Sequence, residues 1–156
     1  MIFRAFHLHK ARFHDQVFSG EGARLAGGRW NRPGTPMVYC SESVALATLE
    51  ILVNLEDRQL LRAYCVATVE FDETVLEEID LGRLPKTWRA APATSSTRDI
   101  GEIWVAEQRS AVLKVPSAVV ATEFNYLLNP RHPDFASLNL GRSEAYSSDS
   151  RLSRDI

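Results

Sequence analysis

Cysteine is scarce in this sequence, and no set of side chains has the spacing of a metal site. Cys40 and Cys65 are the only cysteines among 156 residues, and neither belongs to a CxxC motif. We expect reduced, mostly buried packing residues, and neither a disulfide framework nor a thiolate metal site. His7 and His9 alternate along a predicted strand with His14 nearby, but no Cys, Asp or Glu accompanies them at ligand spacing. A metal centre is therefore not expected.

Long hydrophobic runs and an excess of positive charge are also absent. No window approaches the roughly 18 consecutive apolar residues that a membrane span needs, and residues 1–10 lack the apolar core of a signal peptide. The formal net charge is -2, whereas nucleic-acid binders usually carry a basic face. We therefore expect a cytoplasmic protein that neither enters a membrane nor binds nucleic acid directly.

The composition that remains is that of a soluble globular protein. Hydrophobic residues make up 45% of the chain and charged residues 24%, and the length suits one domain with a continuous core. We expect a single domain over residues 1–156. Residues 141–156 are predominantly polar, so we expect a loosely ordered tail there.

Hydrophobic patterning predicts more strands than helices. The predicted strands cover residues 2–6, 37–40, 61–71 and 135–140, and two further pieces at 113–115 and 118–121 meet at a bend. Helices are predicted from a cap at Ser41 or Ser43 to residue 54, and from about residue 97 to residue 110 with Ser95 or Ser96 as the cap. Residues 13–35 contain five glycines and a proline, which predicts a long functional loop. This irregular mixture favours an α+β fold.

One carboxylate stands in unexpected surroundings. Residues 43–55 are almost entirely apolar, and Glu50 is their only charged residue. An unpaired charge without water costs several kcal/mol or more, so Glu50 must be paired, protonated or used in chemistry. It could form a buried salt bridge with Arg29 or Arg62. Alternatively, it could contact a sugar and stabilise positive charge that grows on the anomeric carbon during glycosyl transfer.

Other residues of the same region favour an anionic ligand that bears a ring. Arg29 follows two glycines, and its guanidinium suits a phosphate, although a surface ion pair is the simpler interpretation. Trp30 could stack on a ring or anchor the loop in the core. Tyr39, between a predicted strand and helix, could stack on an aromatic ligand or belong to the core. Ser117 could donate to a phosphate or cap a bend.

Several strings of the sequence, in their order and spacing, resemble the RES-domain toxins of bacterial toxin–antitoxin pairs. They are FRAF, SGEGARLAGGRWN, MVYCSES, VPSAVVATEFNYLLNPRHPDF and DSRL. The arginine, glutamate and serine that name the family match Arg29, Glu50 and Ser117. The family's tyrosine matches Tyr39, and Trp30 and Asn31 complete the motif around the arginine.

The resemblance implies a fold similar to ADP-ribosyltransferases, with a mixed, mostly antiparallel sheet and a few helices. NAD would lie in a cleft and lose nicotinamide, and its ADP-ribose would pass to a host protein, phosphate or water. Arg29 would hold the diphosphate or the nicotinamide ribose, and Tyr39 would stack on nicotinamide. Glu50 would stabilise the ribosyl cation, and Ser117, with Trp30 and Asn31, would help to bind the nucleotide.

The implied partner is an Xre-type antitoxin with a DNA-binding domain, which would insert a terminal segment near Arg29. Two rival interpretations remain open. One is a toxin without enzymatic activity that binds RNA or the ribosome, and the other is a structural module in which Arg29 and Glu50 form an internal ion pair.

Overall fold

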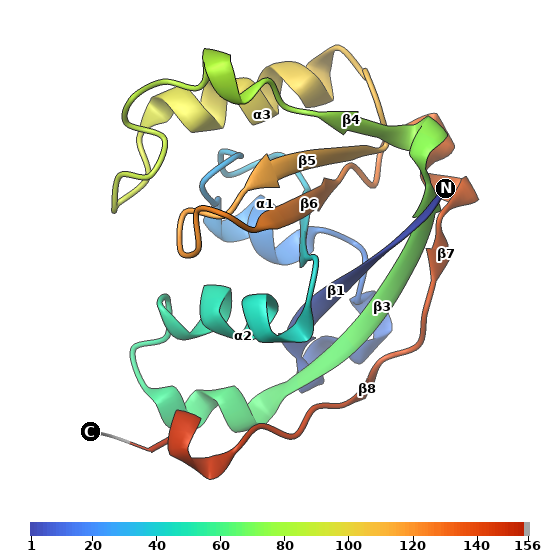
Figure 1. The fold of residues 1–156 in the computed structure, drawn as a ribbon. Helices are drawn as coiled ribbons and strands as arrows, with labels where there is room; N and C mark the ends of the chain where they lie inside the picture. Colours follow the sequence, from blue (N-terminus) through green and yellow to red (C-terminus); the bar gives the residue numbers. More distant parts are fainter. Residues whose placement is uncertain (155–156) are drawn as a thin grey trace.

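The strands join into one curved sheet (Figure 1). This computed structural model describes residues 1–154, apart from the side chain of His14. The strands are β1 (Ile2–Lys10), β2 (Val38–Ser41), β3 (Tyr64–Asp72), β4 (Leu76–Glu78), β5 (Val112–Pro116), β6 (Phe124–Leu128), β7 (Asn139–Leu140) and β8 (Glu144–Ala145). Their order is β4-β5-β6-β2-β1-β3-β7, and β8 also pairs with β3. Only β4 and β5 pair in parallel among these strands, which confirms the predicted α+β fold with a mostly antiparallel sheet.

The longest pairing joins β1 to β3, from Ile2 opposite Asp72 to Lys10 opposite Tyr64. In β3 the buried residues alternate with more exposed ones, as the period of two along a half-buried strand requires. The predicted strand at 61–71 is therefore confirmed from Tyr64 onward. Residues 58–63 form a 3-10 helix instead.

Two of the three α-helices within residues 1–154 follow the predictions. These are α2 (Val44–Leu52) and α3 (Ser95–Ala106). The hydroxyl of Ser43 accepts the backbone N–H of Leu46 at 3.0 Å, so the predicted cap of α2 is confirmed. The predicted serine cap of α3 is wrong, because Thr94 occupies that position without a side-chain cap bond, and the helix ends at residue 106 rather than 110.

The predicted long loop at 13–35 is wrong in part. It contains α1 (Glu21–Ala26), and a 3-10 helix covers Ala11–Gln16. Of the glycines that indicated a loop, Gly20 and Gly27 cap the short helix and Gly22 lies inside it. Gly20 and Gly27 adopt φ values of 72° and 73°, a left-handed region that glycine enters without a steric penalty.

Two predicted strands are also corrected. Residues 118–121 form a turn, because the hydroxyl of Ser117 accepts the backbone N–H groups of Val119 and Val120 and bends the chain. Residues 133–137 form a 3-10 helix, so the strand predicted at 135–140 is reduced to Asn139–Leu140.

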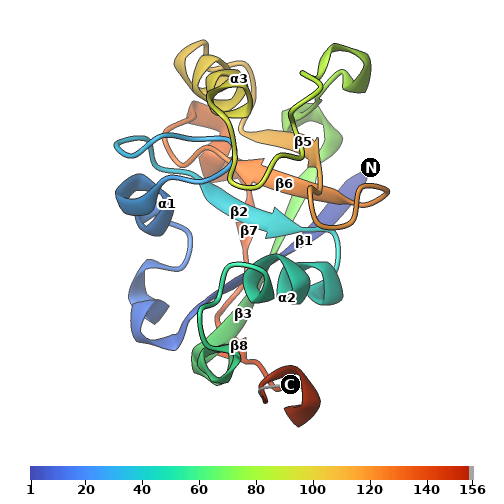
Figure 2. The ribbon, with the colours of Figure 1, turned by 90° about the vertical axis from the view of Figure 1, so that its left-hand side faces the viewer.

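Hydrophobic cores form on both faces of the sheet. On β6, Leu127 packs in a cluster with Trp30 and Trp104, whereas Tyr126 and Leu128 belong to a second cluster with Val69. Neighbouring residues of one strand point to opposite faces, so the two clusters lie on opposite sides. In the views of Figures 1 and 2, α3 lies above the β5–β6 hairpin and α2 lies below it.

The closing segment runs beside β3. Ala145 pairs with Cys65, the hydroxyls of Tyr146 and Thr48 lie 2.6 Å apart, and Arg62 donates to the Ser153 hydroxyl at 3.1 Å. The predicted looseness of this tail stays a prediction. Within residues 1–154, no helix has the length and apolarity to cross a membrane.

Candidate active site

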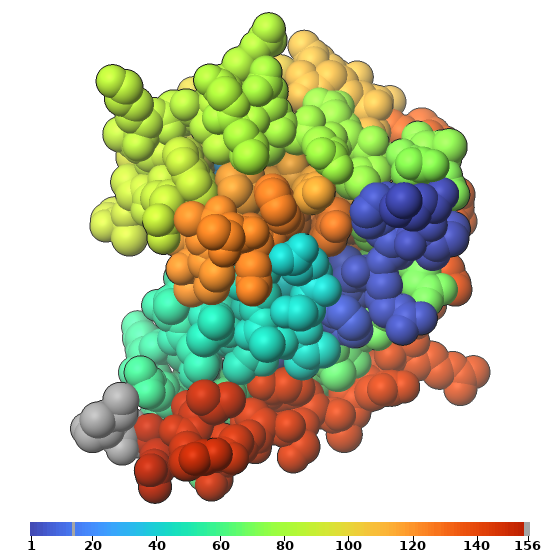
Figure 3. Space-filling model, viewed as in Figure 1, coloured from blue at the N-terminus to red at the C-terminus, as the bar shows by residue number. Residues whose placement is uncertain are grey.

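Helix α2 and the β5–β6 hairpin lie side by side, turquoise and orange in Figure 3. A small cavity of about 60 Å³ opens where α2 packs against strands β1, β2 and β6. Its polar lining comes from Tyr39, Ser41, Glu50 and Asn125, and Leu8 contributes to its apolar wall. The carboxylate that stood out in the sequence therefore faces a cavity.

Glu50 is half-buried on α2 and is held by two neutral groups. The hydroxyl of Ser117 and the amide Nδ2 of Asn125 both donate to its Oε1 atom at 2.6 Å. Neither a hydrogen bond to Oε2 nor an ion pair of Glu50 occurs among the described residues. The salt bridge considered with Arg29 or Arg62 is therefore not formed. Two neutral donors orient a carboxylate but leave its negative charge available.

Ser117 is fully buried directly after β5. Its hydroxyl donates to Glu50 and accepts the N–H groups of Val119 and Val120, at 3.1 and 3.0 Å. Ser117 thus orients the Glu50 carboxylate through one hydrogen bond and stabilises the turn after β5 through two others. Its predicted contact with a nucleotide stays a prediction.

Arg29 enters the same site from the loop before β2. Its Nη1 atom donates to the backbone oxygens of Trp88 and Ala90, at 2.9 and 2.8 Å. Burial lowers the pKa of Arg29, the negative charge of Glu50 opposes this shift, and the positive charge of Arg98 adds to it. An arginine remains charged at neutral pH despite such a shift. The charge of Glu50 therefore acts on Arg29, although the two side chains form no ion pair among the described residues.

Helix α3 supports the loop that carries Arg29. The hydroxyl of Thr97 donates to the Arg29 backbone oxygen at 2.7 Å, and the carboxylate of Glu102 accepts the Arg32 N–H at 2.7 Å. Gly101 lies against the Trp30 carbonyl, where an added Cβ would stand 1.7 Å from the oxygen. The loop is therefore fastened to α3 by several hydrogen bonds, among them these two, and by one very close backbone approach.

Tyr39 is one of the residues that line the cavity, and its hydroxyl forms hydrogen bonds within the protein. The hydroxyl donates to Asn31 Oδ1 at 2.6 Å and accepts the Trp30 N–H at 3.1 Å. Burial raises the pKa of Tyr39, so the phenol is neutral. Asn31 is fully buried and donates to the backbone oxygens of Ala23 and Thr35.

Trp30 belongs to the core, with 2% of its surface exposed. It therefore anchors the loop, which was one of its two interpretations. The predicted contacts of Trp30, Asn31 and Tyr39 with NAD stay predictions.

Sequence reasoning missed three polar residues of the site. Arg98 on α3 donates to the Gly28 backbone oxygen at 3.1 Å, and its charge acts on Arg29 and Tyr39. Asn125 contacts Glu50, and Ser41 contacts Asn125. The signal for Asn125 was available, because it is a polar residue in an apolar strand, as Glu50 is in an apolar helix.

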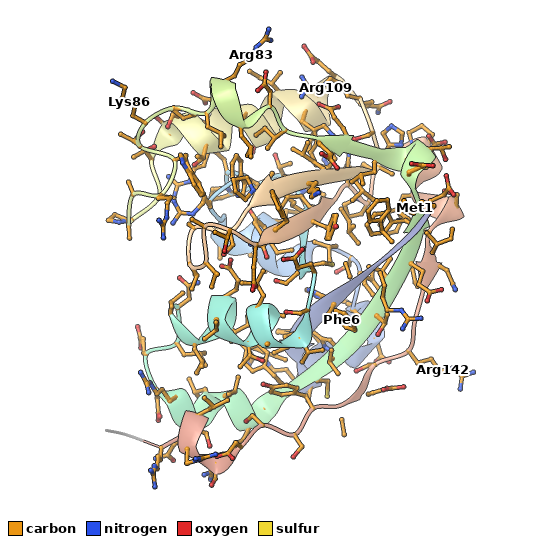
Figure 4. All side chains as sticks on the ribbon, in the orientation of Figure 1. Met1, Phe6, Arg83, Lys86, Arg109 and Arg142 are labelled. Carbon is orange, nitrogen blue, oxygen red and sulfur yellow. The ribbon has the colours of Figure 1, made fainter. Side chains whose placement is uncertain are left out.

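A larger hollow of about 440 Å³ lies elsewhere, between β4 and α3. Its charged lining residues are already paired, with Arg109 bound to Glu77 at 2.9 Å and Arg83 bound to Asp80 at 3.3 Å. Arg83 projects away from the protein body (Figure 4). This hollow lacks an unpaired reactive group, so the smaller cavity at Glu50 is the better candidate.

Within the described part of the chain, no three His, Cys, Asp or Glu side chains are grouped closely enough to hold a metal ion. The expectation that no metal is bound stays a prediction. His7 is instead tied to the backbone, with Nδ1 2.8 Å from the Tyr39 oxygen, and burial lowers its pKa to about 4.

Comparison with known proteins identifies the family. The family model of the RES domain matches residues 1–149. The chain belongs to the RES-domain family. The resemblance noted in the sequence is therefore confirmed, and Arg29, Glu50 and Ser117 all lie within the matched region.

Curated relatives of this RES-domain chain are named as toxins. "Toxin Res" of Photorhabdus laumondii is 36% identical over 148 residues, which cover 94% of this chain and 95% of the relative. The "Prs ADP-ribosylating toxin" of a Sphingobium species is 37% identical over 139 residues, 87% of this chain and 86% of the relative.

A solved structure shares the fold. It is that of the M. tuberculosis MbcT–MbcA toxin–antitoxin complex, with a TM-score of 0.76, 19% identity, and coverage of 94% of this chain and 85% of that one.

Proposed function

We propose that this RES-domain toxin cleaves the bond between nicotinamide and ribose in NAD and transfers the ADP-ribose to an acceptor. The observation that carries the proposal is the state of Glu50. Its carboxylate faces a cavity, is oriented by two neutral donors and has no cationic partner among the described residues. A negative charge kept in this way can stabilise an oxocarbenium-like transition state.

The proposed reaction breaks the glycosidic bond at the anomeric carbon of the nicotinamide ribose. The bonding electron pair goes to the ring nitrogen, so nicotinamide leaves as a neutral molecule. An oxygen of the acceptor then bonds to the anomeric carbon and loses its proton. Glu50 lowers the barrier because the positive charge on the ribose grows close to its free oxygen.

Two arginines would supply the binding of the diphosphate. Nη1 of Arg29 is engaged by backbone oxygens, but its Nη2 and Nε atoms have no partner among the described residues. Arg98 uses only Nε, for the Gly28 oxygen. Two guanidinium groups with donors to spare suit a phosphate pair, because each offers a planar fork of N–H groups.

The size of the cavity limits what can enter it. About 60 Å³ is far smaller than a dinucleotide, so only the reacting end of NAD fits there without movement of the chain. The rest would extend over Arg29 and the segment at residues 85–93. Arg89 of that segment donates to the Ala118 oxygen, so the segment also touches the β5–β6 turn.

A toxin that acts by binding RNA is less well supported. Arg24, Arg29 and Arg32 lie close together in the sequence, but Arg24 is bound to Glu21 and Arg32 to Asp99. Carboxylates next to these two arginines compensate their positive charges, so this region does not form the strongly basic surface that RNA binding needs.

The partner we propose is an antitoxin, since the structural neighbour was solved as a toxin–antitoxin complex. Its Xre type and any host protein that accepts ADP-ribose belong to the same proposal.

The proposal is tested with purified protein and NAD under three conditions, which are buffer, inorganic phosphate and cell extract with labelled NAD. Chromatography measures free nicotinamide, and mass spectrometry identifies ADP-ribose, its phosphate or a labelled protein. We expect nicotinamide in at least one condition, and the product identifies the acceptor. No nicotinamide in any condition, together with RNA binding that weakens steeply with salt, would instead support the RNA-directed toxin.

A further inference from the structure

Asn125 and Ser41 form a polar pair in an otherwise apolar part of the sheet. They lie directly opposite each other in the antiparallel pairing of β6 with β2, so their side chains share one face. Ser41 is buried, and both residues line the cavity at Glu50. Neither residue belongs to the motif that names the family.

A chain of hydrogen bonds runs through this pair to the carboxylate. The Ser41 hydroxyl donates to Asn125 Oδ1 at 2.7 Å, and Asn125 Nδ2 donates to Glu50 Oε1 at 2.6 Å. An asparagine amide has a donor and an acceptor end, and the hydroxyl of Ser41 engages the acceptor end. The donor end is thereby kept toward Glu50.

We propose that Asn125, with its amide fixed by Ser41, is a positioning residue that aims the Glu50 carboxylate at the reacting sugar. This inference rests on the function proposed above and goes beyond it, because it names how the carboxylate is oriented. The two donors of Oε1 come from both sides of one hairpin, Ser117 after β5 and Asn125 on β6. Together they restrict rotation of the carboxylate and leave Oε2 to the site.

The chemistry of an amide suits this role better than that of a charged residue. A lysine or arginine at position 125 would cancel the charge on which stabilisation of the ribosyl cation depends. An aspartate would repel the carboxylate. A neutral donor orients the group and preserves its charge, so loss of the donor should affect the transition state more than the binding of NAD.

The test compares nicotinamide release from NAD by the wild type, Asn125→Ala, Asn125→Asp and Ser41→Ala. We expect kcat to fall about tenfold or more in Asn125→Ala and further in Asn125→Asp, with KM changed less than about threefold. Asn129→Ala is the matched control, because Asn129 is a buried asparagine just after the same strand, and its Oδ1 atom accepts only the Arg131 N–H. It should keep the wild-type kcat even if it lowers stability.

Ser41 provides a test of coupling. If it acts through the amide, Ser41→Ala lowers kcat in the wild-type background and has no further effect in Asn125→Ala. Independent, multiplying effects of the two substitutions would overturn the role of Ser41. An unchanged kcat in both Asn125 variants, or an effect on KM alone, would overturn the role of Asn125.

Failure of the proposed NAD cleavage can be distinguished from failure of the positioning role of Asn125. A wild type that never releases nicotinamide refutes NAD cleavage, and the hydrogen-bond chain is then judged by unfolding alone. Thermal unfolding of Asn125→Ala, Glu50→Gln and the double variant measures the coupling between amide and carboxylate without catalysis. Non-additive changes support the positioning of Glu50 by Asn125, and additive changes overturn it.

Discussion

Replacement of Gly101 by alanine tests how α3 holds the loop that carries Arg29. The new Cβ would stand 1.7 Å from the Trp30 carbonyl oxygen and 2.8 Å from its carbonyl carbon. Both are backbone atoms, so no flexible side chain can move aside. Helix and loop must separate by about 1.5 Å to reach ordinary contact, which opens a gap in a close-packed region.

The separation also stretches the hydrogen bonds of Thr97 and Glu102 to the same loop, which are 2.7 Å each. Overpacking together with two weakened hydrogen bonds predicts a loss of about 3–5 kcal/mol of unfolding free energy. For a chain of this length, that lowers Tm by about 10 °C. Because Arg29 moves with the loop, the affinity of the site for an anionic ligand should fall as well.

Gly22 is the matched control, since it is also a helical glycine but has no atom within 4 Å of an added Cβ. Gly22→Ala should stabilise α1 by about 0.5–1 kcal/mol, through helix propensity alone. Calorimetry or thermal unfolding monitored by circular dichroism measures both variants. A Gly101→Ala protein as stable as the wild type would refute the close approach of α3 and the loop.

Three further predictions concern single side chains. Ser117→Ala removes one hydrogen-bond donor to Glu50 and the acceptor of two backbone N–H groups. We expect kcat, measured by nicotinamide release, to fall about tenfold. The unfolding free energy, measured with denaturant, should fall by about 2–4 kcal/mol. Arg98→Ala should raise KM for NAD about tenfold with little effect on kcat, because it removes a cation from the proposed diphosphate site. His7 has its pKa lowered to about 4 in the folded protein, so between pH 6.5 and 4 the unfolded chain binds the proton more readily and stability falls as pH falls. The loss should reach about 3 kcal/mol at pH 4, and a pH series of unfolding should show a shallower slope for His7→Gln.

The sequence predicts the elements whose signals are local. Alternation in β3 and the serine cap of α2 predict their structures correctly, because burial of one face and capping of N–H groups act within a few residues. The short helix α1 was missed because its flanking glycines, which permit left-handed turns, are also typical of loops. The turn after Ser117 was taken for a strand because one side-chain hydroxyl bends an apolar run.

From the sequence, several residues of the candidate site could be named, but the contacts between them could not. An isolated carboxylate in an apolar helix indicated that Glu50 needs an explanation, and the structure places it half-buried at a cavity. Its role in the reaction stays a prediction. Its partners could not be predicted, because Ser117 and Asn125 are 67 and 75 residues away along the chain. Arg98 was missed for the same reason, since only packing of α3 against the Arg29 loop brings it to the site.

The most direct test of the central claim is release of nicotinamide by Glu50→Gln under single-turnover conditions, with NAD affinity measured by calorimetry. The substitution keeps the shape of the side chain and removes its charge. Glu42→Gln, which changes an exposed carboxylate just before α2, serves as the control. The account predicts a loss of about 10³-fold in the rate for Glu50→Gln with NAD affinity nearly unchanged, and wild-type behaviour for the control. Equal rates for Glu50→Gln and the wild type would contradict it.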